Sequence, residues 1–183
     1  FHALKLPLLG DHQLHNAAVA LTAATVMQQR GWHITDEQIR EGLASVRWPG
    51  RFDVRRTDPL FIIDGGHNPQ CIQALVKNIQ DYLADRPLTI LTGVLADKDY
   101  NCMYRNVEPY AKEFITITPG NPRALNAHEL AKYLSQFGKP VTACDAVADG
   151  VRLAVDHAGK DGVVLCYGSL YMIGEIEAGL QKL

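Results

Sequence analysis

The chain has 183 residues, 47% of them hydrophobic and 21% charged, which is enough for one ordinary α/β domain with a smaller appendage. A formal net charge of -2 provides no basic surface of the kind that binds nucleic acid, so no nucleic-acid partner is expected. No apolar run approaches the ~20 residues of a spanning helix, and the first residues, FHALK, lack a signal-peptide pattern. We therefore expect a cytoplasmic protein without a membrane partner.

The four cysteines are scattered and form no CxxC pair, which argues against a zinc site and a redox motif and predicts reduced, mostly buried thiols. The seven histidines also lack metal-ligand spacing, so we expect no metal ligand in this chain. The first residue is Phe1 rather than methionine, and a helix-forming segment follows almost at once. This beginning suggests a piece of a longer polypeptide.

The first part of the chain is expected to be helical. The alanine-rich stretch Leu14–Arg30 has apolar residues at helical spacing and is followed by Gly31, a favoured residue after a helix. Thr35 and Gln38 form a capping box, which predicts a second, short helix over about 36–46.

The next segment, RWPGRFDVRRTDP, contains two prolines, a glycine and four arginines, so we predict an interdomain hinge at residues 48–59. Strand and helix patterns then alternate to the end of the chain. The expected strands are 60–64, 88–93, 114–118, 141–143 and 162–167, and the expected helices are 69–84, 102–112, 127–137, 145–158 and 170–180. This alternation predicts an α/β, Rossmann-like domain over residues 60–183, with a mainly parallel sheet and helices on both faces. No GxGxxG follows any of these strands, so a dinucleotide site is not predicted.

The segment LFIIDGGHNP at residues 60–69 is the most informative part of the chain. Its apolar run predicts a strand buried on both faces, and Asp64 follows at the carboxyl end, where open α/β sheets bind ligands. The two glycines that follow let the backbone approach a ligand closely. An Asn-Pro pair then favours the start of a helix, so we expect His67 to project from a tight turn over a helix N-terminus.

Polar residues also follow other expected strands. Lys98 lies in GVLADKD after the second strand, Arg123 in PGNPR after the third, and Ser169 follows the last strand after Gly168. Together with Asp64 and His67, they predict a polar site at one edge of the sheet. Structural alternatives are a solvated charged loop for Lys98, a helix cap for Ser169 and a solvated imidazole for His67. No P-loop, nucleophile elbow or HExxH motif is present, so the residues themselves predict a polar binding site and no particular reaction.

Several segments of the chain occur together, in this order, in one enzyme family. They are GDHQLHNAAVA at 10–20, WPGRFDV at 48–54, DGGHNP at 64–69, GVLADKD at 93–99, NPRAL at 121–125 and GSLYMIGEI at 168–176. Over essentially its whole length the chain resembles the C-terminal portion of folylpolyglutamate synthase and bifunctional dihydrofolate synthase, in the Mur ligase superfamily. The family's GTNGKGS-type P-loop and magnesium ligands have no counterpart here. The resemblance thus implies that residues 1–47 are the helical tail of a central ATPase domain and that 60–183 form the C-terminal glutamate ligase domain.

The resemblance implies an ATP-dependent acid-amino-acid ligase that requires Mg²⁺. Such an enzyme phosphorylates the carboxylate of dihydropteroate or of a folate glutamate tail. The amine of L-glutamate then attacks the acyl phosphate, giving an amide, ADP and phosphate. Activation is needed because a carboxylate is a poor electrophile until one oxygen becomes a leaving group. The chain alone is expected to be inactive without its own missing N-terminal domain, and the family implies a monomer.

By resemblance, three residues match nucleotide-binding positions. Asn16 matches a contact to the adenine end of ATP, with a polar residue on a packed helix as the alternative. Arg51 matches an ATP-binding arginine, and its planar, permanently charged guanidinium suits a polyphosphate. Asp64 matches an ATP contact to the ribose hydroxyls. The other arginines of this segment are expected to be solvated: Arg47, Arg55 and Arg56.

On the glutamate side, His67 and Ser169 match positions that bind glutamate or complete the active site, and we predict them as catalytic. Lys98 is predicted to hold a carboxylate of the incoming glutamate. The family usually has alanine where this chain has Gly66, a loss of one methyl that removes no chemical group. Two other functions remain open: a muramyl-peptide or cyanophycin-type ligase of the same superfamily, and a non-catalytic α/β domain that binds a small anion.

Overall fold

The computed structural model describes residues 1–183 and divides them into two compact units, Phe1–Pro49 and Gly50–Leu183, each considered by itself. The first unit contains helices α1 (Asp11–Gln29) and α2 (Asp36–Ser45). The predicted capping box is present at the start of α2. The backbone N–H of Gln38 donates to Thr35 Oγ1 (3.2 Å), and the N–H of Thr35 donates to Gln38 Oε1 (2.9 Å).

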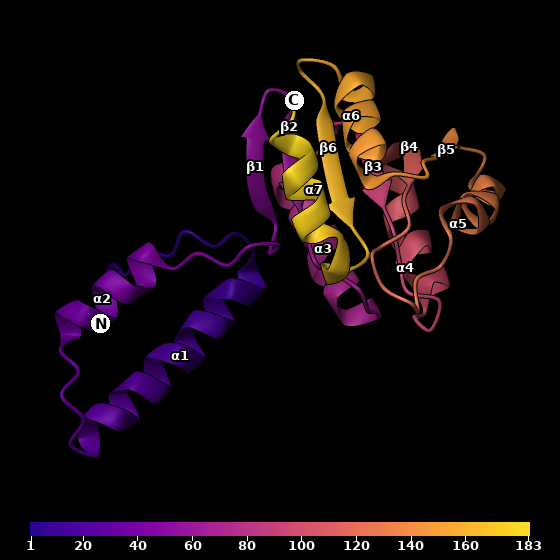
Figure 1. Cartoon of the computed structure of the whole chain (residues 1–183). Helices are drawn as coiled ribbons and strands as arrows, with labels where there is room; N and C mark the ends of the chain where they lie inside the picture. Colours follow the sequence, from indigo (N-terminus) through magenta and orange to yellow (C-terminus); the bar gives the residue numbers. More distant parts are fainter. The chain divides into compact units, whose positions relative to one another are not determined.

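The second unit is built on a six-stranded sheet (Figure 1). Its strands are β1 (Asp53–Thr57), β2 (Leu60–Ile63), β3 (Leu88–Thr92), β4 (Ala111–Thr116), β5 (Val141–Ala143) and β6 (Val163–Tyr167). Its helices are α3 (Pro69–Tyr82), α4 (Tyr100–Val107), α5 (Ala127–Leu134), α6 (Val147–Ala158) and α7 (Ile173–Leu180), with short 3₁₀ turns at Glu108–Tyr110, Ser135–Phe137 and Leu170–Met172. The strand order is β1-β2-β6-β3-β4-β5, and every neighbouring pair is parallel except β1 with β2. The predicted mainly parallel α/β fold is confirmed.

Helices cover both faces of the sheet, α3 and α4 on one side and α6 and α7 on the other (Figure 1). Successive strand residues alternate between the two layers. On the α6 and α7 side, Leu91 and Cys166 belong to a buried cluster with residues of both helices. On the other side, the ring of Tyr104 from α4 lies 6.3 Å from Phe114 and 5.7 Å from Tyr167, measured between centroids. This two-sided burial explains why β2 and β6 are built of hydrophobic residues throughout.

The predicted hinge segment contains a strand that the sequence analysis missed. β1 pairs antiparallel with β2 and forms an edge of the sheet, where charged side chains can remain in solvent. Arg55 is exposed, as expected for a solvated arginine, and its guanidinium also contacts Asp53 (3.2 Å) and Glu177 of α7 (2.9 Å). Arg56 likewise donates from Nε to the carbonyl of Asp58 (2.6 Å). Arg55 therefore links this edge strand to α7.

A buried acid lies near the amino-terminal ends of β3 and β4. Glu113 is 7% exposed and accepts hydrogen bonds from Thr89 Oγ1 (3.0 Å) and His157 Nδ1 (2.7 Å), while Lys112 Nζ lies 3.6 Å from it. Burial by itself raises the pKa of the Glu113 carboxyl. The two hydrogen bonds and the charges of His157 and Lys112 together outweigh burial and lower this pKa below its ordinary value.

Candidate functional site

The loops after β2, β6 and β3 meet because these parallel strands are neighbours in the sheet. The N–H of Gly168, after β6, donates to the carbonyl of Gly66, after β2 (3.1 Å). Gly168 has φ +123°, and a Cβ there would lie 2.4 Å from the carbonyl oxygen of Gly93, after β3. Glycine is required at this point because the backbones of the loops approach too closely for a side chain.

A cleft of about 450 Å³ opens beside this junction. Its lining residues come from the loops after four strands: His67, Leu95, Lys98, Arg123, Ser169, Leu170 and Tyr171. All three residues predicted for the glutamate side, His67, Lys98 and Ser169, thus line one cleft. They are far apart in the sequence and are brought together by the order of the strands.

His67 is half-buried in the turn that precedes α3. Its Nδ1 lies 2.8 Å from the carbonyl oxygen of Gly65. Because a carbonyl only accepts hydrogen bonds, Nδ1 carries the hydrogen, which leaves Nε2 of the neutral ring as an acceptor. As predicted, Asn68 caps α3 by accepting from the N–H of Cys71 (2.9 Å), with Pro69 as the first helical residue.

Two cations line the cleft in different electrostatic situations. The ammonium of half-buried Lys98 has no hydrogen-bond or ion-pair partner within the chain, whereas Arg123 is paired with Asp97 (2.7 Å). Arg123 was noted after its strand but given no role. The loop that carries Arg123 is paired with the loop after β3 through an isolated β-bridge between Leu95 and Ala124. No local sequence pattern predicts this pairing.

Ser169 is 2% exposed, and its Oγ accepts the N–H of Tyr171 (3.3 Å), so it caps the following 3₁₀ turn as the structural alternative predicted. The carbonyl of Tyr167, two residues earlier, accepts from Thr92 Oγ1 (2.7 Å), which in turn lies 2.8 Å from the hydroxyl of Tyr104. Since the Thr92 hydroxyl donates its single hydrogen to the carbonyl of Tyr167, the Tyr104 hydroxyl must donate to Thr92 Oγ1. Burial raises the pKa of the Tyr104 hydroxyl, which keeps it in the donating form.

Asp64 and Arg51 belong to segments that are hydrogen-bonded to each other, but Asp64 is buried whereas Arg51 is half-exposed. Asp64 is 8% exposed; its Oδ1 accepts the N–H of Gly66 (2.7 Å) and its Oδ2 accepts the N–H of Phe52 (3.0 Å). The half-exposed Arg51 guanidinium has no hydrogen-bond or ion-pair partner within the chain. A Cβ on Gly66 would lie 2.9 Å from Asp64 Oδ1, so the glycine leaves room for this carboxylate.

Asn16, the third predicted nucleotide residue, lies on α1 in the first unit, where its Nδ2 donates to Gln13 Oε1 (3.0 Å). The other predicted site residues all lie in the second unit. Cys166 is buried and the other three cysteines are half-buried, all of them free thiols.

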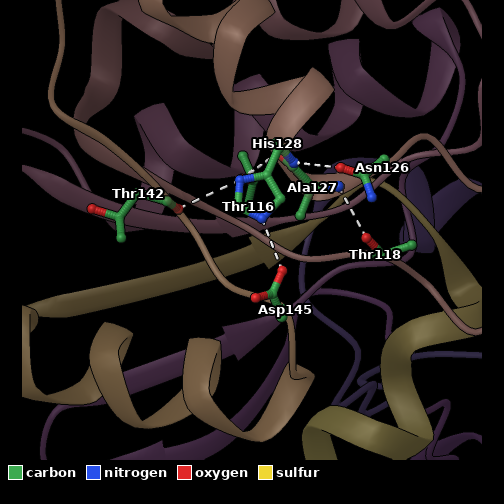
Figure 2. A network of polar contacts seen from close by, with 7 residues as sticks. All are labelled: Thr116, Thr118, Asn126, Ala127, His128, Thr142 and Asp145. Atoms are coloured by element: carbon green, nitrogen blue, oxygen red, sulfur yellow. Dashed lines mark hydrogen bonds and ion pairs between the residues drawn. The ribbon is translucent and has the colours of Figure 1, made fainter.

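A second polar network lies at the ends of β4 and β5 (Figure 2). His128 Nε2 contacts Asp145 (2.8 Å), and the N–H of Ala127 donates to Thr118 Oγ1 (2.9 Å). Thr116 Oγ1 also donates to the carbonyl of Ala127 (2.8 Å). These bonds attach the start of α5 to the sheet, and none of the residues lines the cleft.

Two further properties concern the whole chain. No three or more His, Cys, Asp or Glu side chains are grouped so that they could hold a metal ion. None of the helices combines the length and the apolar character that crossing a membrane requires.

Comparison with known proteins assigns this site to a family. Residues 50–170 match the family model "Mur ligase, glutamate ligase domain". The chain belongs to the Mur ligase family. The matched range includes the strands and every residue of the cleft except Tyr171.

Relatives of this Mur ligase chain are named as folate enzymes. It is 40% identical over 124 residues to folylpolyglutamate synthase of Lacticaseibacillus casei, covering 67% of this chain and 29% of that protein. The structure of Mycobacterium tuberculosis folylpolyglutamate synthase complexed with ADP and AMPPCP matches with a TM-score of 0.80 and 30% identity, over 96% of this chain and 41% of that one. E. coli FolC in complex with DHPP and ADP matches with a TM-score of 0.85 and 25% identity, over 100% of this chain and 42% of that one. The chain thus spans less than half the length of these relatives.

Proposed function

We propose that this chain supplies the glutamate side of an ATP-dependent ligase that adds L-glutamate to dihydropteroate, to folate glutamate tails, or to both, through an acyl phosphate. The observation that carries the proposal is the cleft that gathers His67, Lys98 and Ser169 within a glutamate ligase domain. The names of the relatives favour folates as the acceptors. On this proposal the first unit is the tail of an ATPase domain, and the segment 48–59 is the hinge next to it.

The cleft has the groups that an amino acid substrate needs. The unpartnered ammonium of Lys98 suits a carboxylate of glutamate, because a charge without an internal partner gains most from a new one. The attacking amine must lose a proton, and we propose that the acceptor Nε2 of His67, which lines the cleft, takes it. The Ser169 hydroxyl keeps its hydrogen for the substrate, since its oxygen accepts from the backbone.

The nucleotide side of the proposal rests on Arg51. Its free, half-exposed guanidinium fits a polyphosphate, which a bidentate cation recognises well. Asn16 is proposed to contact the adenine, and Asp64 belongs to the same nucleotide site. The residues of this chain do not fit a magnesium ion. We therefore propose that the metal ligands and the P-loop lie in a separate N-terminal domain, and that the enzyme is a cytoplasmic monomer.

The test is glutamate-dependent release of ADP by the polypeptide that contains this chain together with the sequence that precedes it in the gene. We expect turnover with dihydropteroate or reduced folates, and none with the chain of residues 1–183 alone. Turnover with UDP-muramyl peptides but not with pteroates would assign a muramyl ligase instead. Absence of any ATP-dependent ligation would favour a domain that only binds small anions.

A substitution in the cleft tests the assignment of Lys98. Lys98→Met should raise the KM for glutamate by about tenfold or more while the KM for ATP stays unchanged, because one charged contact to a carboxylate is lost. Lys132→Met, at an exposed lysine of α5, is the matched control and should change neither constant. A parallel rise of both KM values would count against a glutamate contact at Lys98.

A further inference from the structure

We propose that Leu170 and Gly65 form a packed contact that positions His67 at the cleft. Leu170 directly follows Ser169 in the chain, and Gly65 lies two residues before His67, so the contact joins the loops after β6 and β2. The inference rests on the proposed function of His67 in glutamate ligation. It deepens that function by identifying what holds the imidazole in place, and it makes Leu170 a positioning residue.

The side chain of Leu170 fills the space in which a side chain of residue 65 would begin. A Cβ on Gly65 would overlap Leu170 Cδ2 and would lie 3.1 Å from its Cγ. The backbone of Gly65 does not have the positive φ that favours glycine, so it is the neighbour that excludes a side chain here. Leu170 is nevertheless 45% exposed and lines the cleft, so the open space beside it is the cleft itself.

Gly65 is also held through its backbone. Its N–H donates to the carbonyl of Gly50 (2.7 Å), and its carbonyl accepts from His67 Nδ1 (2.8 Å). Ile173, three residues after Leu170, occupies the equivalent space at Gly50, where an added Cβ would overlap its Cδ1. The two apolar side chains thus pack on two hydrogen-bonded glycines. Because the imidazole of His67 is bonded to the carbonyl of Gly65, a shift of this glycine moves the imidazole as well.

The competing explanation is that Gly65 lacks a side chain because a ligand approaches its backbone. The structure disfavours this explanation, since Gly65 is buried and Leu170 already occupies the space beside its α-carbon. The two explanations make opposite predictions for a double substitution. If Leu170 is the obstacle, shortening it makes room for a methyl group at residue 65. If a ligand is the obstacle, shortening Leu170 gives no relief.

The experiment is a double-mutant cycle of Gly65→Ala and Leu170→Ala in the full ligase. We expect Gly65→Ala to lower kcat/KM for glutamate by about tenfold to a hundredfold, because a displaced proton acceptor works poorly. The loss should appear in kcat, with the KM for ATP unchanged. Leu170→Ala should lower kcat/KM by only about threefold, because both backbone bonds of Gly65 remain.

The double variant decides between the explanations. Gly65→Ala/Leu170→Ala should be more active than Gly65→Ala alone by about fivefold or more, because the added methyl group no longer meets Leu170. A double variant that is no more active than Gly65→Ala would overturn the proposal. Gly174→Ala, which adds a methyl group in open space on α7, is the matched control. It should leave kcat/KM unchanged and should show no coupling to Leu170→Ala.

Nuclear magnetic resonance of the histidine rings gives a readout that needs no activity. At about pH 8.5, where ordinary histidine rings are neutral, ¹⁵N–¹H spectra of the chain of residues 1–183 should show His67 with its hydrogen on Nδ1. The signal is assigned by its loss in His67→Gln. Gly65→Ala should populate the other tautomer, and the double variant should restore the first.

The same spectra keep the proposal testable if a variant does not fold. A wild-type His67 ring with its hydrogen on Nε2 would overturn the proposal without any variant, because the bond to the carbonyl of Gly65 would then be absent. If the wild-type ligase showed no ATP-dependent ligation, the proposed function would fail. Rescue of the Nδ1 tautomer in the double variant would in that case still support the contact between Leu170 and Gly65.

Discussion

Replacing Thr92 by valine tests the buried hydrogen-bond chain that holds the loop carrying Ser169. Thr92→Val keeps the shape of the side chain but removes the hydroxyl. The change leaves the hydroxyl of Tyr104, a residue that is 0% exposed, without its hydrogen-bond acceptor, and it removes one donor from the carbonyl of Tyr167. Each such loss costs about 1–3 kcal/mol, so we expect the free energy of unfolding to fall by about 2–4 kcal/mol.

The partner substitution separates this explanation from a general packing defect. Tyr104→Phe leaves Thr92 bonded to the carbonyl and should cost about 1 kcal/mol. The double variant Thr92→Val/Tyr104→Phe no longer buries an orphaned hydroxyl, so its cost should fall below the sum of the single costs by at least ~0.5 kcal/mol. Strict additivity would refute the hydrogen-bond chain.

The assay is urea unfolding followed through the tyrosines by near-ultraviolet circular dichroism. All seven tyrosines lie in the second unit and both tryptophans in the first, so the tyrosine signal reports on the sheet domain. The control is Thr142→Val, an exposed threonine on β5, which should stay within about 0.5 kcal/mol of the wild type. A Thr92→Val cost as small as the control's would show that the chain does not stabilise the fold.

Three further predictions concern stability. Gly168→Ala should lower the free energy of unfolding by about 2–5 kcal/mol, because the residue has φ +123° and its new Cβ would lie 2.4 Å from a carbonyl oxygen. Gly174→Ala, in open space on α7, should instead raise it by about 0.5–1 kcal/mol. The midpoints of urea unfolding measure both effects. Glu113 has a lowered pKa in the folded state, so its stabilisation is present above the ordinary carboxyl pKa and is lost as pH falls through the folded value. Urea unfolding between pH 7 and pH 3 should therefore show a gap between wild type and Glu113→Gln that closes at low pH. Arg55→Met should cost no more than about 1 kcal/mol by the same assay, since its ion pairs are partly solvated.

Local signals in the sequence determined much of the secondary structure. The Thr35 and Gln38 box, the Asn-Pro start of α3 and the cap at Ser169 each depend on contacts within three residues, so they could be predicted from the chain itself. The alternation of apolar runs and helical patterns likewise predicted the α/β class, because strands buried on both faces are rich in hydrophobic residues.

Helix and strand limits were less certain where a local signal competed with pairing. The helix predicted over 102–112 instead ends as α4 at Val107 and passes through a 3₁₀ turn containing Pro109. β4 then begins at Ala111, earlier than the strand predicted at 114–118, because pairing with β3 extends it.

Tertiary structure alone decided which polar residues meet. β6 lies between β2 and β3 in the sheet, so Ser169 lines the same cleft as His67 and Lys98. Ser169 and His67 are nevertheless about a hundred residues apart in the sequence. The same folding made β1 an edge strand, placed Arg123 in the cleft and turned Asp64 toward the N–H groups of Phe52 and Gly66. Strand order and side-chain direction arise from pairing between distant segments, and a one-dimensional pattern of residues does not encode which of those pairings forms.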